Sequence, residues 1–515
     1  MTEVQVVTGN ITDIDCDVLI VNLFEGVTRP GGATGAVDAA LGGLISDAIR
    51  AGDLTGRWGE TAILYTGGRI RARKVLVAGL GQAARFGYRE VFRVAALAAR
   101  AARASGATRI ASIAHGAGIG GLDPARAAQF TVDGTLHGLY RFAGYRTEPQ
   151  PERPQVEAFL LVERDPERAR AMAEGARTGR LLAEAAAWAR DLGNRPGNRL
   201  TAAMLADEAV AMARDTGLEA EVLGPEEAER LGMGLLLAVN RGSAEPARVI
   251  VLRHRGGRNS GRAASGQQAG GGWPLALVGK GLTFDTGGIS IKPSENMWDM
   301  KFDMCGGAAV LGAMRAIAQL AVPLDVLAVV PATDNMPDGA SYKPGDVIRG
   351  LSGKTVEIRS TDAEGRLILA DGLAYAVREG ARRLVTISTL TGGVAVALGS
   401  VRFGLLANDD RWYEEVAAAA EEAGERGWRL PSDEDYRELL RSPVADMTNG
   451  GRREASTIQG GVFLFQHVGG VPTVHMDIAA TAWLRDKTAE ADEGATAVGL
   501  RTLVATARRL AAAGG

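Results

Sequence analysis

Short apolar runs alternate with helix-patterned segments along most of this chain, and this alternation restricts the fold more than any other feature. In the first third, the strand-like runs are 18–22, 74–80, 109–115 and 158–163, and the helix-like segments are 93–104 and 124–142. Strands that alternate with helices predict an α/β layer built on a mainly parallel sheet.

A second block of the same kind follows one long Ala/Arg/Glu-rich helical pattern. Its expected strands are 249–254, 275–279, 325–333, 355–360 and 383–389, and its expected helices are 306–321 and 366–379. A chain of 515 residues is too long for one ordinary core. We therefore predict a smaller N-terminal α/β domain over 1–165 and a linking helix over 166–190. A larger C-terminal α/β domain with a central mixed sheet is expected over 191–515.

The overall composition is that of a soluble globular protein. The formal net charge is -3, so the whole chain has no general attraction to nucleic acid or to anionic membranes. No run of 18 or more apolar residues predicts a membrane span, and the first residues do not resemble a signal peptide. The two cysteines, Cys16 and Cys305, form no metal-binding pair. These features favour a cytoplasmic protein.

Four carboxylates are expected to meet at one edge of the second sheet. Asp285 lies in a glycine-rich turn after strand 275–279, and Asp303 precedes helix 306–321. Asp362 and Glu364 follow strand 355–360, and on an extended segment they would point to the same side. Unpaired carboxylates at this spacing would repel one another, whereas two divalent cations would balance their charge. The pattern therefore predicts a two-metal site.

Lysines gather in the same region although the rest of the chain uses mostly arginine. Of its seven lysines, Lys280, Lys292 and Lys301 fall within 22 residues. A buried lysine beside cations can lose its proton and bind metal, which arginine cannot do. Lys280, directly after a strand, is the better ligand candidate. Lys292 and Arg366 remain as cations that could stabilise an oxyanion.

No histidine lies in the three stretches that contain the candidate site residues. The five histidines are His115, His137, His254, His467 and His475, and all lie outside 278–307, 360–367 and 388–393. A histidine-rich zinc site and a Ser-His-Asp triad both lose support.

The combined motifs resemble those of the leucyl aminopeptidase (cytosol aminopeptidase) family of dinuclear metallopeptidases. The three most specific are KGLTFDTGGISIKP (280–293), MWDMKFDM (297–304) and TDAEGRL (361–367). Further similar segments are RDLGNRPGNRLT (190–201), TLTGG (389–393), VADMTN (444–449), VHMDIAATAW (474–483) and GATAVGLRTL (494–503). The resemblance covers about 190–510 and implies a macro-domain-like N-terminal domain.

The resemblance also implies roles for individual residues and for cofactors. The metal ligands would be Lys280, Asp285, Asp303, Asp362 and Glu364, with Asp285 and Glu364 bridging two ions of manganese, zinc or a related metal. Lys292 and Arg366 would be catalytic, with Arg366 holding a bicarbonate ion as general base. The substrate-binding residues would be Met300, Thr389, Leu390 and Gly392. The expected protein is a homohexamer that removes N-terminal residues, leucine and similar ones, from peptides.

Two positions and one longer stretch depart from the family pattern. Ser360 replaces a usual Asn on the substrate side, and Thr286 in DTGG replaces a usual Ser while keeping the hydroxyl. The Gly/Arg-rich stretch 253–274 is longer and more basic than in the family, and we expect a flexible surface loop there.

Three other functions would use some of the same residue types. A two-metal phosphoesterase would also use carboxylates, but histidine ligands or several phosphate-binding arginines would be expected nearby. The arginines of 253–262 could contact nucleic acid, although the acidic net charge favours an insertion without such a partner. The segment GAGIGG (116–121) formally fits a dinucleotide-binding motif, but no acidic residue follows at the required distance.

Overall fold

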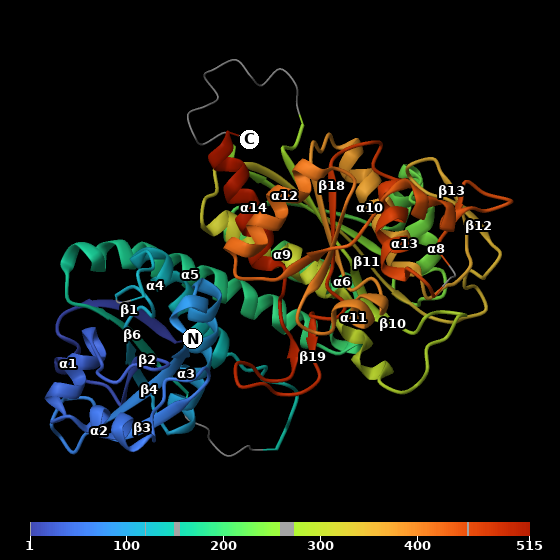
Figure 1. Ribbon diagram of the computed structural model, residues 1–515. Helices are drawn as coiled ribbons and strands as arrows, with labels where there is room; N and C mark the ends of the chain where they lie inside the picture. The colour runs from blue at the N-terminus through green and yellow to red at the C-terminus, as the bar shows by residue number, and fades with distance from the viewer. Residues whose placement is uncertain (1, 119, 149–154, 258–271, 451–452, 515) are drawn as a thin grey trace. The chain divides into compact units, whose positions relative to one another are not determined.

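The protein is described by a computed structural model that covers residues 2–118, 120–148, 155–257, 272–450 and 453–514. The chain forms two compact units (Figure 1). Unit 1 contains Met1–Ala187 together with Asp486–Glu493, and unit 2 contains Trp188–Arg485 and Gly494–Gly515. Segment 486–493 therefore joins the N-terminal unit although it lies near the end of the chain. The helical pattern expected over 166–190 is part of α5, Pro166–Asn194.

Unit 1 is built on a six-stranded sheet in the order β1-β6-β5-β2-β4-β3. The strands are β1 Glu3–Thr8, β2 Val18–Phe24, β3 Thr61–Tyr65, β4 Lys74–Gly81, β5 Arg109–Ser112 and β6 Ala158–Glu163. Only β3 runs antiparallel to its neighbour, at one edge. The mainly parallel sheet expected from the alternating pattern is present.

Helices cover both faces of this sheet. They are α1 Gly32–Ala40 and α2 Leu44–Ala51 on one face, and α3 Tyr88–Ala104, α4 Pro124–Leu139 and the first part of α5 on the other (Figure 1). Successive side chains of β2 alternate between the two cores, since Val18 and Ile20 pack with α3 and α4 while Leu19 and Val21 pack with α1 and α2. A strand that is buried on both faces consists of a continuous run of apolar residues, which explains the sequence pattern.

Unit 2 is built on a nine-stranded mixed sheet in the order β16-β15-β18-β14-β9-β11-β8-β7, with β10 paired to β11. The strands are β7 Glu219–Leu223, β8 Arg248–Arg255, β9 Leu275–Gly279, β10 Gly281–Asp285, β11 Asp325–Asn335, β14 Leu384–Ser388, β15 Phe403–Ala407, β16 Gly427–Arg429 and β18 Thr473–Asp477. The central strands β11, β9, β14 and β18 are parallel. Strands β8 and β15 add antiparallel to β11 and β18.

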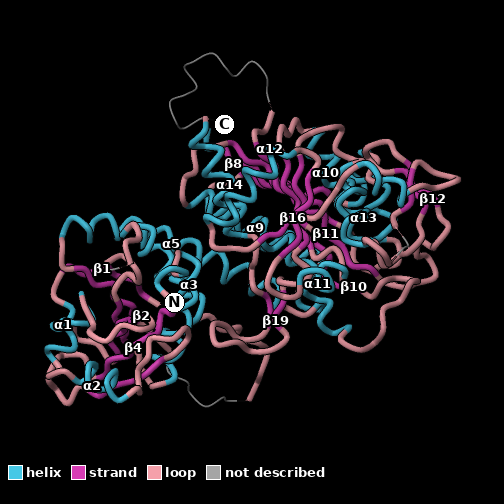
Figure 2. The backbone as a smooth tube through the Cα atoms, in the orientation of Figure 1, coloured by secondary structure: helices cyan, strands magenta, loops and turns pink. Residues whose placement is uncertain are grey.

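Helices pack on both faces of this sheet as well (Figure 2). The first face is covered by α6 Ala202–Thr216, α9 Cys305–Gln319, α12 Asp410–Glu422 and α14 Leu500–Ala513, and the second by α8 Gly234–Asn240, α10 Glu364–Arg378 and α13 Ser456–Phe465. The short helices α7 Pro225–Leu231 and α11 Gly393–Leu398 lie in connections.

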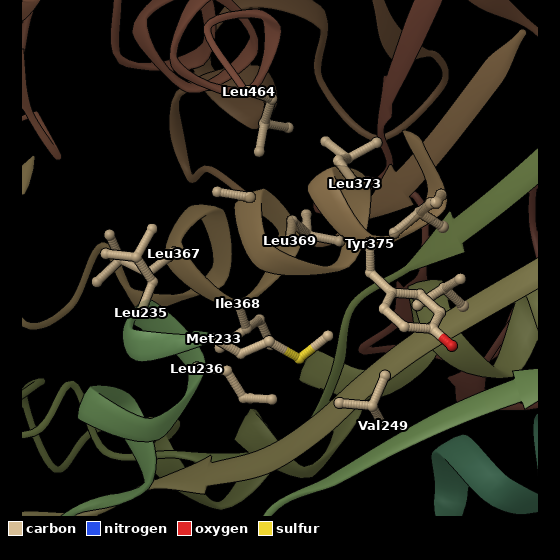
Figure 3. Packing of buried hydrophobic residues seen from close by; sticks show 14 of the residues in the cluster. Met233, Leu235, Leu236, Val249, Leu367, Ile368, Leu369, Leu373, Tyr375 and Leu464 are labelled. Carbon is tan, nitrogen blue, oxygen red and sulfur yellow. The ribbon is translucent and has the colours of Figure 1, made fainter. Parts of the chain in front are cut away.

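The core on the second face holds α10 in a fixed position. Figure 3 shows Leu235 and Leu236 of α8 against Leu367 and Ile368 of α10, with Val249 of β8 beneath them. Each such fully buried side chain stabilises the fold by about 1.5–3 kcal/mol relative to an exposed one. Because α10 begins with Glu364, this packing also fixes the position of a predicted metal ligand.

One expected strand does not belong to the main sheet. Segment 355–360 was predicted as a strand of the central sheet, but only β13, Thr355–Glu357, is extended. It pairs with β12 Val347–Arg349 and β17 Met447–Thr448 in a separate small sheet, and β19 Trp483–Leu484 pairs with β20 Gly494–Ala495 in another. Short strands of this kind lack the apolar length that places a strand in a sheet centre.

Among the described helices, none combines the length and the apolar character needed to cross a lipid bilayer. Most of the Gly/Arg-rich stretch 253–274, namely 258–271, lies outside the described residues, so the predicted loop stays a prediction.

Candidate metal centre

The candidate site lies where the central parallel strands of unit 2 end. Lys280 directly follows β9, and Asp285 is the last residue of β10. Thr389 follows β14, while Asn335 and Asp477 are the last residues of β11 and β18. Parallel neighbours have their carboxyl ends at the same edge, so strands far apart in the sequence deliver side chains to one place.

Three carboxylates form the buried centre of the site. Each of Asp285, Asp303 and Glu364 offers one oxygen, and these oxygens lie within 4.8 Å of one another. Asp303 comes from the 3₁₀ segment Met297–Met304, and Glu364 begins α10. All three side chains are buried, so their mutual repulsion is poorly screened by water.

Two lysine side chains form ion pairs with these carboxylates and with Asp362. Lys280 Nζ lies 2.7 Å from Asp303 Oδ2 and 2.8 Å from Glu364 Oε1. Lys292 Nζ lies 2.7 Å from Asp285 Oδ2 and 2.5 Å from Asp362 Oδ1. Lys280 is almost completely buried, whereas 23% of the Lys292 side chain is exposed. The more accessible ammonium group is therefore that of Lys292, which is better placed to meet a substrate.

Burial and charge act in opposite directions on these groups. Burial raises the pKa of Asp303 to about 7, although Lys280 opposes the shift. Burial alone would lower the pKa of Lys280, but Asp303, Glu364 and Asp285 raise it above its ordinary value. Burial also opposes the charge of Glu364, yet Lys280 and Lys292 hold the pKa of Glu364 below its usual range. The ammonium and carboxylate groups thus depend on one another for their charges.

Asp362 occupies a different local structure from the one expected. Its carboxylate is about one-third exposed, and the segment is a turn in which Asp362 N donates to Ser360 Oγ at 3.2 Å. The prediction that Asp362 and Glu364 share one face of an extended segment was therefore wrong. Glu364 reaches the centre because α10 begins there, and Asp362 reaches Lys292 from the preceding turn.

Arg366 lies in the first turn of α10 and is buried. Its Nη1 donates to the carbonyl oxygen of Asn449 at 2.8 Å, and its Nε has no hydrogen-bond partner within the described part of the chain. Burial lowers the pKa of Arg366 to about 10, while Glu364 and Asp477 act in the opposite direction. A buried guanidinium with an unused donor is suited to hold a small anion.

The predicted substrate-side residues lie around this centre. Thr389 Oγ1 donates to Asp303 Oδ1 at 2.5 Å, and the Leu390 amide donates to Asp477 Oδ1 at 3.3 Å. Met300 is half-buried in the 3₁₀ segment, and Gly392 is exposed just before α11. The hydroxyl of Thr286, which a serine would also provide, donates to the Asn335 carbonyl at 2.7 Å.

Two residues in the site were not found from the sequence. Asn335 Nδ2 donates to Asp285 Oδ1 at 2.9 Å, which orients a predicted ligand. Asp477 is buried and accepts from Thr391 Oγ1 at 2.6 Å. Each is the polar residue that ends an apolar strand, and that position was the available signal.

The donor set fits divalent cations. Glu364 Oε2 is buried and accepts no hydrogen bond from any described residue, while Asp303 Oδ2 is paired with the ammonium group of Lys280 at 2.7 Å. Buried carboxylate oxygens normally have such partners, and oxygen-rich sites suit hard divalent ions. Lys280 would add a nitrogen ligand once deprotonated, since a metal ligand must give up its proton.

Comparison with known proteins agrees with this geometry. The model of the cytosol aminopeptidase family, catalytic domain, matches residues 187–504, and the model of the N-terminal domain of the same family matches residues 20–149. The chain belongs to the cytosol aminopeptidase family. A probable cytosol aminopeptidase of Alkaliphilus metalliredigens (strain QYMF) is 42% identical over 508 residues, which is 98% of this chain and 99% of that relative.

Two solved structures share the fold of this chain. The bottromycin maturation enzyme BotP in complex with Mn has a TM-score of 0.81 and 36% identity, covering 96% of this chain and 99% of BotP. A mutant of tomato leucine aminopeptidase has a TM-score of 0.85 and 30% identity, covering 99% of this chain and 97% of the tomato chain. The family, the two-domain α/β fold with its mixed sheet, and the peptidase class predicted from the sequence are thereby confirmed.

Proposed function

We propose that this chain is a metal-dependent aminopeptidase that removes leucine and similar N-terminal residues from peptides. The observation that carries the proposal is the buried cluster of Asp285, Asp303 and Glu364, with Lys292 at its more exposed side. Membership of the cytosol aminopeptidase family supports the reaction class.

Two divalent ions, manganese or zinc, are the proposed cofactors. Lys280, Asp285, Asp303, Asp362 and Glu364 would hold them. When bound, such ions polarise a peptide carbonyl and lower the pKa of a bound water to about 7. The complex of BotP with Mn makes manganese the first ion to test.

Lys292 and Arg366 would have separate catalytic roles. Lys292 would donate a hydrogen bond to the oxygen of the scissile carbonyl as that oxygen gains negative charge. Its partial exposure leaves the ammonium group accessible to a substrate while Asp285 and Asp362 hold it in place. Arg366 would hold bicarbonate, a proton acceptor, and its unused Nε donor supports this assignment.

The remaining proposed contacts orient the peptide. Met300 would line the pocket for the first side chain, and the backbone at Thr389, Leu390 and Gly392 would position the substrate. The Leu390 amide already donates to Asp477, so the contribution of Leu390 would come from its carbonyl group.

We also propose that the protein is cytoplasmic and that it forms a homohexamer, the assembly that the family resemblance implies. Multi-angle light scattering of the purified chain tests the assembly. A mass near six times 53.7 kDa would support the hexamer, and a monomer mass would contradict it.

Hydrolysis of leucine p-nitroanilide tests the proposed activity. The protein is stripped of metal, assayed, reloaded with manganese or zinc, and assayed again beside an N-acetylated substrate and a phosphate ester. Restored release of nitroaniline, with the acetylated substrate and the ester intact, supports a metallo-aminopeptidase. Cleavage of the ester alone would favour the phosphoesterase alternative.

A further inference from the structure

Asn449 lies beside the candidate metal centre but is neither a proposed metal ligand nor a proposed catalytic residue. It directly follows β17 and is completely buried. Its side-chain amide contacts the turn that carries Asp362, and its main-chain carbonyl contacts Arg366. One residue from a distant part of the sequence therefore touches the supports of a proposed metal ligand and of a proposed catalytic group.

The side chain of Asn449 continues the pairing of two short strands. Strand β17 pairs in parallel with β13 as far as Thr448 and Glu357. Beyond that point Asn449 Oδ1 accepts hydrogen bonds from Arg359 N at 2.8 Å and from Ser360 N at 3.4 Å, and Asn449 Nδ2 donates to the Ser360 carbonyl at 2.7 Å. Because both ends of a buried amide are paired with the same segment, the backbone of Arg359 and Ser360 is fixed.

Ser360 connects Asn449 to Asp362, since Ser360 Oγ accepts a hydrogen bond from Asp362 N at 3.2 Å. Asp362 needs such support because 37% of its side chain is exposed, whereas the other four proposed ligands are buried. Thr361 is held from the other side, where Tyr342 Oη donates to its carbonyl at 2.8 Å. The turn is therefore held from two sides, and the side of Asn449 is the one that leads to the amide of Asp362.

The main chain at Asn449 and Gly450 sets the position of Arg366. The Asn449 carbonyl accepts a hydrogen bond from Arg366 Nη1 at 2.8 Å. Gly450 has a φ of +119°, which favours glycine, and a β-carbon at this position would lie only 2.8 Å from Arg366 Nη1. Any side chain at position 450 would therefore push the guanidinium away from the carbonyl that holds it.

We propose that Asn449 is a positioning residue that holds Asp362 through its side chain and Arg366 through its main chain. The inference rests on the proposed function, since it takes Asp362 as a metal ligand and Arg366 as a catalytic residue. Asn449 itself touches neither metal nor substrate in this proposal. Its two contacts keep the metal ligand and the catalytic cation at a fixed distance from each other, although the turn and α10 carry them separately.

Asn449→Ala tests the contact with the turn, because it removes the amide and keeps the carbonyl that accepts from Arg366. We expect the affinity for one of two manganese ions to fall about 10–100-fold, as for loss of a group that orients a metal ligand, while the other ion is retained. Manganese titration of the metal-stripped protein in competition with a fluorescent chelator measures both affinities. Unchanged affinity for both ions in this variant would overturn the proposal.

Asn408→Ala is the matched control. Asn408 Nδ2 donates to the Val471 carbonyl at 3.0 Å, and Asn408 Oδ1 accepts from Thr473 N at 2.7 Å, so this amide also holds a backbone segment with both ends. Asn408 follows β15, which runs antiparallel to β18, so it lies at the opposite edge of the sheet from the metal centre. We expect its manganese affinities to equal those of the parent protein, and an equal loss in both variants would reduce Asn449 to a general structural role.

A double-mutant cycle with Asp362→Ala tests the path of the effect. Asp362→Ala alone should weaken the same ion, and adding Asn449→Ala should cause little further loss, because the amide acts through Asp362. Additive losses would overturn the proposal. Unchanged manganese affinity in Asp362→Ala would instead reject the ligand assignment of the proposed function, so the two failures are distinguishable.

Ser360→Ala gives the same information if Asn449→Ala does not fold. It removes the acceptor of the Asp362 amide and keeps the backbone contacts of Asn449. Ser360 is only half-buried, so the variant should fold, and we expect it to weaken the same manganese ion. Parent-like affinity in a folded Ser360→Ala protein would overturn the connection from Asn449 to Asp362.

Gly450→Ala tests the contact with Arg366. The added methyl group displaces the guanidinium but no proposed metal ligand, so both manganese ions should be retained while kcat for leucine p-nitroanilide falls about 10²-fold, as for a catalytic group misplaced by about 1 Å. Gly470→Ala is the control, because Gly470 also has a positive φ, +84°, but a β-carbon there meets nothing within 4 Å. Equal kcat in the two glycine variants would overturn the role at Arg366.

Discussion

The ammonium group of Lys280 lies against the backbone of Gly365, where a β-carbon would stand only 2.6 Å from Nζ. The space around this nitrogen is filled by Gly365, Asp303 and Glu364, which leaves no room for the larger guanidinium of arginine. This contact explains in physical terms why a chain so rich in arginine keeps lysine at position 280.

Lys280→Arg should therefore lose bound metal. Arginine does not fit the space and does not give up its proton to become a ligand. We expect metal content to fall by at least one ion per chain, with hydrolysis of leucine p-nitroanilide reduced at least about 100-fold, as for loss of a catalytic group. Elemental analysis after dialysis measures the first effect. Lys301→Arg, which can keep the cationic contact with Trp483, is the control and should retain both ions.

Lys292→Ala should separate catalysis from metal binding. The Lys292 side chain is partly exposed and touches Asp285 and Asp362, so its removal leaves the buried carboxylates in place. Loss of one hydrogen bond to a developing oxyanion lowers kcat about 10²–10³-fold. Steady-state kinetics and metal analysis of the same sample measure both properties, with the exposed Lys343→Ala as control. A variant that lost its metal along with its activity would argue that Lys292 has a structural role instead.

The strand pattern of the sequence placed Lys280 directly after an apolar strand, and Lys280 does follow β9. The same pattern placed Asp285 in a glycine-rich turn, whereas Asp285 is the last residue of β10, Gly281–Asp285. The pattern could not predict Asn335 and Asp477, since each becomes part of the site only through the order β18-β14-β9-β11, which joins strands far apart in the chain. The prediction for Asp362 was wrong because the chain after β13 forms a turn and then begins α10, where a longer extended strand was expected. Segment 486–493 joins unit 1 through long-range contacts such as the ion pair of Arg100 with Asp492, which no local pattern records.

Thr389→Val should weaken metal binding without unfolding the protein. The Thr389 hydroxyl donates to Asp303 Oδ1 at 2.5 Å, and valine keeps the shape while removing the donor. Loss of a hydrogen bond that orients a metal ligand typically costs 10–100-fold in metal affinity. Competition with a fluorescent chelator measures this affinity, and Thr61→Val on the edge strand β3 is a matched control. Equal metal affinity in the two variants would show that Asp303 keeps its orientation by other contacts.

His115 should make unit 1 sensitive to acid. Its side chain is fully buried, and burial lowers its pKa from 6.5 to about 4. Between these two pH values the unfolded chain binds a proton at His115 that the folded chain excludes. The free energy of unfolding is therefore unaffected by His115 above pH 6.5 and decreases as the pH falls towards 4. The shift corresponds to about 3 kcal/mol at most. We expect His115→Gln, which keeps a partner for Asn22 but does not titrate, to lose less stability than the parent between pH 7 and pH 4.5, as measured by hydrogen exchange of peptides from β2 and β5. An equal loss in both proteins would assign the acid sensitivity of this unit to other groups.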